Sequence, residues 1–332
     1  MNSSGLVKKL IASIVLTALC SGPVFAVDKV KFNLAWLPQG STGGILVAIA
    51  KGFYAEAGID VTAMRGYGGQ RTVNEIDQGL FEFGYGDPIS VMLNRSQGGK
   101  TIMVGTINTR WPAALCYIDK PGRKIQTVAD LKGMVLGGGA ASPLQNIVPT
   151  WLQQNKLPVD YIKVLRLDPS VINSSFLEGR IDLAECWEGA NKPVLEFLLK
   201  KEGKKLGSLR YRDANLNLYG NGIVTTEKMI ATNPDLVKRF VRATYRGYAF
   251  QRTNPKEAAD GIAAQQRLLD KNILQQQISE TNLIIDDPEA SNNKPGWMRA
   301  DRMQSTVDFV NKAFKLESPI RAADIYTNRF VE

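Results

Sequence analysis

The chain has 332 residues, of which 44% are hydrophobic and 22% are charged, and this length suffices for one large or two ordinary globular domains. It contains no histidine, which excludes Ser-His-Asp and Cys-His nucleophilic catalysis as well as histidine-based zinc sites. The formal net charge is +9, but the basic residues are scattered along the chain, so we expect a solvated surface and no nucleic-acid partner.

The first predicted element is a cleavable secretory signal peptide over residues 1–26. Lys8 and Lys9 precede an apolar run at 10–19, and Ala26 is a small residue suited to cleavage. The run is too short to span a membrane comfortably, and no later stretch reaches about 18 apolar residues. We therefore expect a soluble exported protein whose mature form carries a net charge of about +7.

Strands and helices alternate through the next 160 residues or so. The predicted strands are 30–36, 59–64, 81–85, 101–107, 134–136, 164–167 and 181–186. The predicted helices are 44–57, 72–79, 89–98, 127–131, 143–155 and 170–178, and from residue 228 the chain is mostly helical. Asn233-Pro234 and Asn254-Pro255 each supply a cap followed by proline at the first helical position. This alternation predicts α/β lobes with mostly parallel sheets.

One local pattern occurs twice and predicts two similar lobes. Residues 77–87 read DQGLFEFGYGD and residues 177–188 read LEGRIDLAECWE, so each has a glycine, an apolar/acidic alternation, an aromatic residue and then an acid. We expect one lobe to hold residues 27–115 and 220–332, and the other to hold 116–219. The chain would return to the first lobe near the end of the second one.

Ligands of open α/β sheets bind beyond the carboxyl ends of the strands. Tyr85 and Asp87 lie at such an end in the first lobe, and Trp187 and Glu188 lie at the equivalent end in the second. Two lobes that face each other would place these residues on opposite walls of one cleft. We therefore predict that both aromatic-plus-acid pairs contact a ligand.

Further candidate ligand contacts come from other strand ends and from the return crossing. Trp36 follows the first strand in a polar loop, and Ser142 caps a helix after a glycine-rich turn whose N–H groups suit an anion or a carbonyl oxygen. The remaining candidates are Gln39, Thr42, Arg71, Tyr219 and Asn221. We predict no catalytic residue, metal ligand or cofactor.

The mature chain keeps two cysteines, Cys116 and Cys186. An oxidising compartment permits a disulfide, but their spacing cannot show that the two residues meet. The expectation is two free, half-buried thiols, with pairing left open.

The candidate residues favour a planar ligand. Aromatic rings with carboxylates suit a flat nitrogen heterocycle that carries N–H donors, or another aromatic compound. An alkanesulfonate, taurine or nitrate ligand would need cations and N–H donors instead, and Arg71 with the glycine-rich turn before Ser142 keeps that alternative open. An enzyme is a third class, against which the lack of histidine weighs.

Three stretches carry a family resemblance: LAWLPQGSTGGILVAIAKGFYAEAGIDV at 34–61, ADLKG at 129–133 and NPDLVKRFVRA at 233–243. They resemble periplasmic substrate-binding proteins of the thiamine-pyrimidine-synthase-like group, which also resemble nitrate, taurine and alkanesulfonate binders. The resemblance implies a periplasmic type II binding protein with two lobes, a hinge and an interlobe cleft. It further implies a monomer that delivers a small molecule to the membrane permease of an ABC importer.

The first loop departs from the pyrimidine-binding pattern of that group. Ala35, Gln39 and Thr42 stand where the pyrimidine branch has Asp, Asn and His. The related fungal synthase uses that histidine and a cysteine-rich motif, and both are absent from this sequence. The resemblance therefore implies binding and not pyrimidine synthesis.

Overall fold

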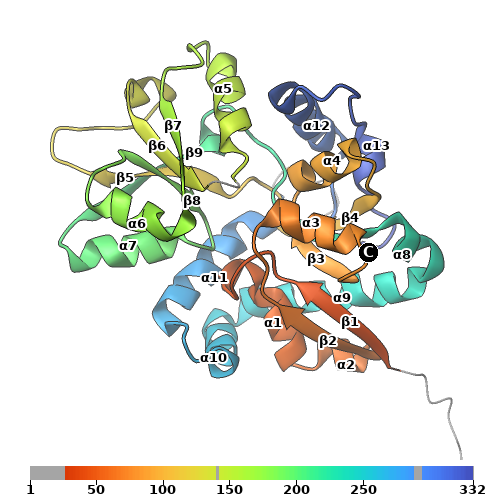
Figure 1. Ribbon diagram of the computed structural model, residues 1–332. Helices are drawn as coiled ribbons and strands as arrows, with labels where there is room; N and C mark the ends of the chain where they lie inside the picture. The colour runs from red at the N-terminus through yellow and green to blue at the C-terminus, as the bar shows by residue number, and fades with distance from the viewer. Residues whose placement is uncertain (1–26, 140–141, 288–293, 332) are drawn as a thin grey trace, which may run out of the picture.

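The computed structural model describes residues 27–139, 142–287 and 294–331, so the predicted signal peptide lies outside the described residues. Two five-stranded sheets form the cores of two lobes (Figure 1). The sheet of lobe 1 has the order β2 (Ile59–Met64), β1 (Asp28–Asn33), β3 (Phe83–Gly86), β10 (Gly222–Thr226) and β4 (Thr101–Thr106). The sheet of lobe 2 has the order β7 (Lys163–Leu167), β6 (Val135–Gly139), β8 (Leu183–Trp187), β5 (Ala113–Asp119) and β9 (Lys205–Arg210).

The two sheets share one plan, because β3 and β8 each hold the central position. In lobe 1, β1 pairs in parallel with β2 and β3, whereas β10 is antiparallel to β3 and β4. In lobe 2, β6 pairs in parallel with β7 and β8, whereas β5 is antiparallel to β8 and β9. Both sheets are therefore mixed, but four of the five strands in each run in the same direction, in agreement with the prediction of mostly parallel sheets. The strand that enters each sheet from the other lobe, β10 or β5, runs against its neighbours.

Helices cover the faces of both sheets (Figure 1). Those before the first crossing are α1 (Gly43–Ala50), α2 (Phe53–Glu56), α3 (Gly69–Asp77) and α4 (Pro88–Ser96). Lobe 2 adds α5 (Leu144–Gln154), α6 (Pro169–Leu177) and α7 (Lys192–Lys201). The C-terminal helices are α8 (Glu227–Thr232), α9 (Pro234–Thr253), α10 (Pro255–Gln265), α11 (Lys271–Ile285), α12 (Ala300–Phe314) and α13 (Ala322–Ile325). Short 3-10 turns lie at Gly40–Thr42 (η1), Val128–Leu131 (η2) and Tyr211–Asp213 (η3).

Local sequence signals explain where several of these helices begin. The Asn-Pro caps are confirmed, since α9 and α10 start at Pro234 and Pro255. The predicted helix over 44–57 is broken into α1 and α2 at Gly52, whose φ of 73° L side chains rarely adopt. The helix after the glycine-rich turn starts one residue later than predicted, with Pro143 as its cap and the Ser142 hydroxyl accepting a hydrogen bond from the Leu144 N–H at 3.3 Å.

Two chain segments connect the lobes. The first is 107–112, and the second is 214–221, which leads back into β10. They lie side by side, because the carbonyl of Asn221 accepts hydrogen bonds from the N–H groups of Ile107 and Asn108 at 2.9 and 2.8 Å. The predicted lobe boundary after residue 115 falls inside β5, so a boundary drawn from strand pairing lies in 107–112 instead.

The C-terminal helices pack on lobe 1 and also reach lobe 2. On α9, Phe240 stacks on Phe83, Tyr54 and Phe32 with ring centroids 4.1, 5.0 and 5.8 Å apart. Helix α12 contacts α4 of lobe 1 and α5 of lobe 2, and α11 contacts α7. A continuous apolar core, to which α12 contributes, therefore joins the lobes on one side of the crossings.

The two cysteines form a disulfide, which corrects the expectation of free, half-buried thiols. Cys116 on β5 and Cys186 on β8 are both fully buried, and their sulfur atoms are bonded. In the antiparallel register Cys116 is opposite Ala184 and Cys186 is opposite Ala114, so the bridge links neighbouring strands. Because β5 was not among the strands predicted from the sequence, the proximity of the two cysteines could not be inferred.

Candidate ligand-binding cleft

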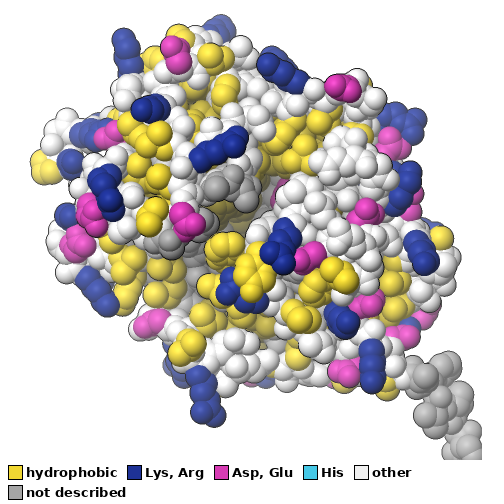
Figure 2. All heavy atoms as spheres, viewed as in Figure 1, with side chains coloured by type: hydrophobic (Ala, Val, Ile, Leu, Met, Phe, Trp, Pro, Cys, Tyr) yellow, Lys and Arg dark blue, Asp and Glu magenta, His cyan; other side chains and the backbone are white. Residues whose placement is uncertain are grey.

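The turn after β1 and the end of β8 meet across the interlobe gap. The N–H of Ser41, in the turn after β1, donates to the carbonyl of Gly189, just after β8, at 2.9 Å. On the face shown in Figure 2 the surface is recessed between the two lobes. Two other open hollows lie outside this recess, one beside α12 and one between α7 and α11. The recess is the place where parallel strands of both sheets end, and we take it as the candidate ligand site.

The lobe 2 wall carries a buried carboxylate beside an indole ring. Glu185 and Trp187 lie on one face of β8, because side chains alternate along a strand, and Cys186 points into the separate core beneath. The indole Nε1 of Trp187 donates to Oε1 of Glu185 at 2.9 Å. The ring of Trp187 meets Trp111 of the first crossing edge-on, with centroids 5.9 Å apart. The tryptophan is thereby held in one orientation.

Glu185 is 9% exposed, and no cation of the described chain lies within ion-pair distance of it. Burial raises the pKa of the Glu185 carboxyl, while hydrogen bonds from Ser142, Trp187 and the Gly139 backbone oppose that rise. Ser142 is therefore a hydrogen-bonding neighbour of Glu185, and its contact with a ligand stays a prediction.

A buried hydroxyl lies near this carboxylate. Tyr211 is fully buried against Trp111 and Trp151, with ring centroids 5.1 and 4.6 Å away. Its hydroxyl has no hydrogen-bond partner among the described residues. Burial, together with the negative charge of Glu185, raises the pKa of Tyr211 well above its ordinary value. A buried hydroxyl is normally hydrogen-bonded, so the Tyr211 hydroxyl is a donor that none of the described residues uses.

The lobe 1 wall is built from the loops after β1 and β2. The ring of Trp36 is 41% exposed, and the backbone around it is fixed by Asn33, whose buried Oδ1 accepts from the Ala35 N–H at 2.9 Å. The N–H of Gly66 donates to the Trp36 carbonyl at 3.2 Å. A Cβ on Gly66 would approach the Ala35 backbone to 2.5 Å, so only glycine allows these loops to pack so closely. Trp36 thus presents its ring from a fixed loop.

Arg71 lies on the same side of the cleft. It lies in the first turn of α3 with its side chain exposed, and its Nε donates to Glu75 at 2.7 Å. Its guanidinium lies 4.8 Å from the ring centroid of Tyr67, and that of Arg65 lies 4.4 Å from the same centroid. Tyr67 is 54% exposed, so an aromatic ring with two cations stands beside Trp36.

The side chains of Tyr85 and Asp87 both form hydrogen bonds with other residues of the protein. The Tyr85 hydroxyl donates to Oδ1 of Asn108 at 2.7 Å, and burial raises the pKa of this phenol. Asp87 caps α4 by accepting from the N–H and the hydroxyl of Ser90 at 2.9 and 3.0 Å. Burial raises the pKa of the Asp87 carboxyl as well. Asp87 therefore has a structural role at the strand end that does not depend on a ligand.

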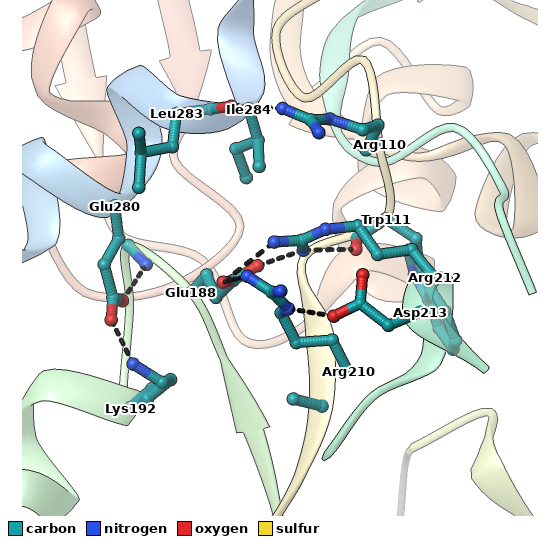
Figure 3. A network of polar contacts seen from close by, with 12 residues as sticks. Arg110, Trp111, Glu188, Lys192, Arg210, Arg212, Asp213, Glu280, Leu283 and Ile284 are labelled. Carbon is teal, nitrogen blue, oxygen red and sulfur yellow. Dashed lines mark hydrogen bonds and ion pairs between the residues drawn. The ribbon is translucent and has the colours of Figure 1, made fainter. Parts of the chain in front are cut away.

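Glu188 is held in an ion-pair network just after the end of β8 (Figure 3). Arg212 binds both of its carboxylate oxygens, one of them at 3.0 Å, and Arg210 lies 3.8 Å away. The side chains of Glu188 and Arg212 are each 7% exposed. The prediction that Glu188 contacts the ligand is not supported by this geometry, because Arg212 already satisfies the carboxylate.

The other predicted residues stabilise turns and crossings. Gln39 and Thr42 bind each other across η1, where the Thr42 hydroxyl donates to the Gln39 carbonyl at 3.1 Å. Tyr219 is fully buried and accepts from the Arg299 N–H at 2.7 Å, and burial raises its pKa to about 12. Asn221 holds the two crossings together through its carbonyl.

Polar contacts join the 189–192 turn of lobe 2 to lobe 1 (Figure 3). On α11, Glu280 accepts from the Gly189 N–H at 2.8 Å and pairs with Lys192 of α7. Gln277 donates to the Ala190 carbonyl at 2.7 Å. Helix α11 therefore contacts the end of β8 directly, next to the crossings.

Residues 39–258 match the model of the family described as NMT1/THI5 like. The chain belongs to this family. The match confirms the resemblance inferred from the three sequence stretches.

Relatives of this NMT1/THI5-like chain are named as binding proteins. It is 27% identical over 312 residues to the riboflavin-binding protein RibY of Chloroflexus aurantiacus, covering 92% of this chain and 86% of the relative. It is 21% identical over 307 residues to the formylaminopyrimidine-binding protein of Halalkalibacterium halodurans, covering 91% of each. The fold is similar to that of the periplasmic aliphatic sulphonate binding protein SsuA of Escherichia coli, with a TM-score of 0.68 at 14% identity over 92% of this chain and 94% of that one. The predicted two-lobe binding-protein fold is confirmed.

Among the residues that the structure describes, no helix is long and apolar enough to cross a membrane. Within the same residues, no cluster of three or more potential ligand side chains could hold a metal ion.

Four residues in or behind the walls of this candidate cleft were not predicted from the sequence: Arg65, Tyr67, Glu185 and Tyr211. Glu185 could have been predicted from the sequence, because it lies two residues before Trp187 in a strand, and residues two apart in a strand point to the same face of the sheet. Tyr67 and Arg65 had a weaker signal in the loop after the second strand. Tyr211 had none, since its approach to Glu185 depends on the pairing of β5 with β9.

Proposed function

We propose that this protein binds a planar nitrogen heterocycle in the interlobe cleft outside the cytoplasm and delivers it to the permease of an ABC importer. The binding-protein fold and the predicted signal peptide support the role in import. Two relatives are named for binding riboflavin and formylaminopyrimidine, and each of these compounds contains a flat nitrogen heterocycle. The ligand leaves the protein chemically unchanged.

The observation that carries the heterocycle proposal is the pair of Glu185 and Trp187. A buried carboxylate without a cation accepts hydrogen bonds strongly from N–H donors, and such donors lie at the edge of most nitrogen heterocycles. The indole beside it offers an apolar face, and the Tyr211 hydroxyl offers a buried donor for a ring carbonyl or nitrogen. Trp36 supplies a second ring from the opposite lobe. We assign the ligand-binding acid to Glu185 in place of Glu188.

An alkanesulfonate-type anion is the second candidate ligand. It is favoured by the exposed guanidinium groups of Arg65 and Arg71 and by the likeness in fold to a sulphonate binder. The two classes differ in their response to the charge of Glu185. A negative carboxylate stabilises a bound N–H donor and repels a bound sulfonate.

The test is calorimetric titration of wild-type protein and Glu185→Gln with riboflavin, an aminopyrimidine, taurine and an alkanesulfonate. For a heterocycle, loss of the charge-assisted hydrogen bond should weaken binding by about 10- to 150-fold. Glu178→Gln is the matched control, because this exposed carboxylate of lobe 2 pairs with Arg180 at the surface. Heterocycle binding that is equal in both variants, or binding of sulfonates alone, would refute the assignment.

A further inference from the structure

The loop after β2 gathers positive charge at the edge of the cleft. Arg65 and Arg71 both place their guanidinium groups within cation–π distance of the exposed Tyr67 ring, at 4.4 and 4.8 Å from its centroid. The ring is 54% exposed, so this cluster faces solvent and does not belong to the core. Figure 2 shows basic and hydrophobic side chains together on lobe 1 beside the recess.

The charge of this cluster is only partly balanced. Arg71 is paired with Glu75, which also accepts from the buried Nδ2 of Asn33 at 2.8 Å. Among the described residues, no carboxylate lies within ion-pair distance of Arg65, whose Nε reaches only the carbonyl of Gly66 at 3.4 Å. Two cations and one acid leave a net positive charge.

The cluster adjoins the ring that we assign to stacking. The N–H groups of Gly66 and Gly68 donate to the carbonyls of Trp36 and Ala35 at 3.2 and 2.8 Å, so the two loops form one unit. A ligand stacked on Trp36 would therefore extend its substituent toward Arg65 and Arg71. Guanidinium groups bind phosphate and carboxylate through paired hydrogen bonds, which makes them suited to such a substituent.

We infer that the ligand is a planar heterocycle with an anionic substituent, and that Arg65 and Arg71 bind that anion at the cleft edge. The inference rests on the proposed function for the planar ring. It unites the two ligand classes, because the ring contacts the aromatic and acidic walls while the anion contacts the arginine pair. Tyr67 holds the two guanidinium groups in place.

The experiment titrates neutral and anionic forms of the same ring. The pairs are riboflavin with riboflavin 5′-phosphate, and a hydroxymethylpyrimidine with its phosphate ester. Because the arginines are exposed, the expected preference for the phosphate form is about 10-fold at low salt and falls as salt is added. A carboxymethyl form of each ring shows whether the site takes anions generally or phosphate alone.

The variant Arg65→Gln/Arg71→Gln should reduce this preference, measured as the ratio of the affinities for the anionic and the neutral form, to about 2-fold. Arg180→Gln, an exposed arginine of lobe 2, is the control and should keep the preference. Equal affinity for neutral and anionic forms in wild type, or a preference that survives in the double variant, overturns this inference and leaves the proposed function standing. Binding of neither form overturns both.

Discussion

The buried ion pair of Glu188 and Arg212 should stabilise the junction of the lobes without contacting the ligand. Glu188 follows β8, and Arg212 lies in η3 just before the second crossing, so the pair links both ends of the lobe 2 core to the crossings (Figure 3). Arg212 also donates to the Trp111 carbonyl in the first crossing, at 3.4 Å. The variant Glu188→Leu removes the carboxylate and leaves a guanidinium that is 7% exposed beside apolar side chains.

The magnitude follows from that burial. Removing one partner of a buried pair costs about 3–5 kcal/mol, because the remaining charge stays desolvated without compensation. For Glu188→Leu, Arg210 carries a like charge near Arg212 and offers no relief. With about 2–4 °C per kcal/mol for a chain of this size, the midpoint of thermal unfolding should fall by at least about 6 °C.

The assay is scanning calorimetry of Glu188→Leu, Arg212→Met and the double variant Glu188→Leu/Arg212→Met. Replacing both charges with apolar side chains of similar size is often neutral, so the double variant should recover to within about 1 kcal/mol of wild type. The affinity of each folded variant for the heterocycle should stay close to that of wild type. A single variant as stable as wild type, or one that loses ligand affinity at unchanged stability, would refute this assignment and return Glu188 to the ligand site.

Three further predictions concern export, the disulfide and pH. Protein recovered from outside the cytoplasm should begin at Val27 in N-terminal sequencing, and an intact Met1 there would exclude cleavage of the predicted signal. Cys116→Ala/Cys186→Ala should lose about 4 kcal/mol of stability, because the bridge closes a loop across a sequence separation of 70 residues, and alkylation should find no free thiol in wild type. Burial raises the pKa of the Glu185 carboxyl above its ordinary value of 4.5, so the folded protein binds this proton more tightly than the unfolded chain does. The contribution of Glu185 to stability therefore falls as the pH rises above 4.5. Glu185→Gln should remove that part of the pH dependence of the thermal unfolding midpoint, and an unaltered pH profile would contradict the reasoning.

The sequence revealed the architecture because the architecture depends on local patterns. Apolar periodicity located most strands of both sheets, and the repeated aromatic-plus-acid pattern ended at β3 and β8, which hold the same position in each lobe. Strand β5 was missed although its residues are apolar. It enters the lobe 2 sheet directly from a crossing, so it does not take part in the strand–helix alternation along the chain that located the other strands. Missing β5 also hid the disulfide.

The site was harder to predict because side-chain partners come from distant segments. Glu185 and Glu188 are three residues apart at the end of the same strand, and the sequence cannot tell which of them is paired. The pairing partner of Glu188 is Arg212, which approaches only through the β5 and β9 pairing. Asp87 was ambiguous for a simpler reason, since an aspartate before proline caps a helix whether or not a ligand is near.

The most direct test of the central claim is native mass spectrometry of the protein isolated from its own host, with release and identification of the retained small molecule. Our account predicts an aromatic nitrogen heterocycle, bound one to one and released unmodified, that Glu185→Gln protein no longer retains. An aliphatic sulfonate, a nitrate ion or a chemically altered product in the cleft would contradict it.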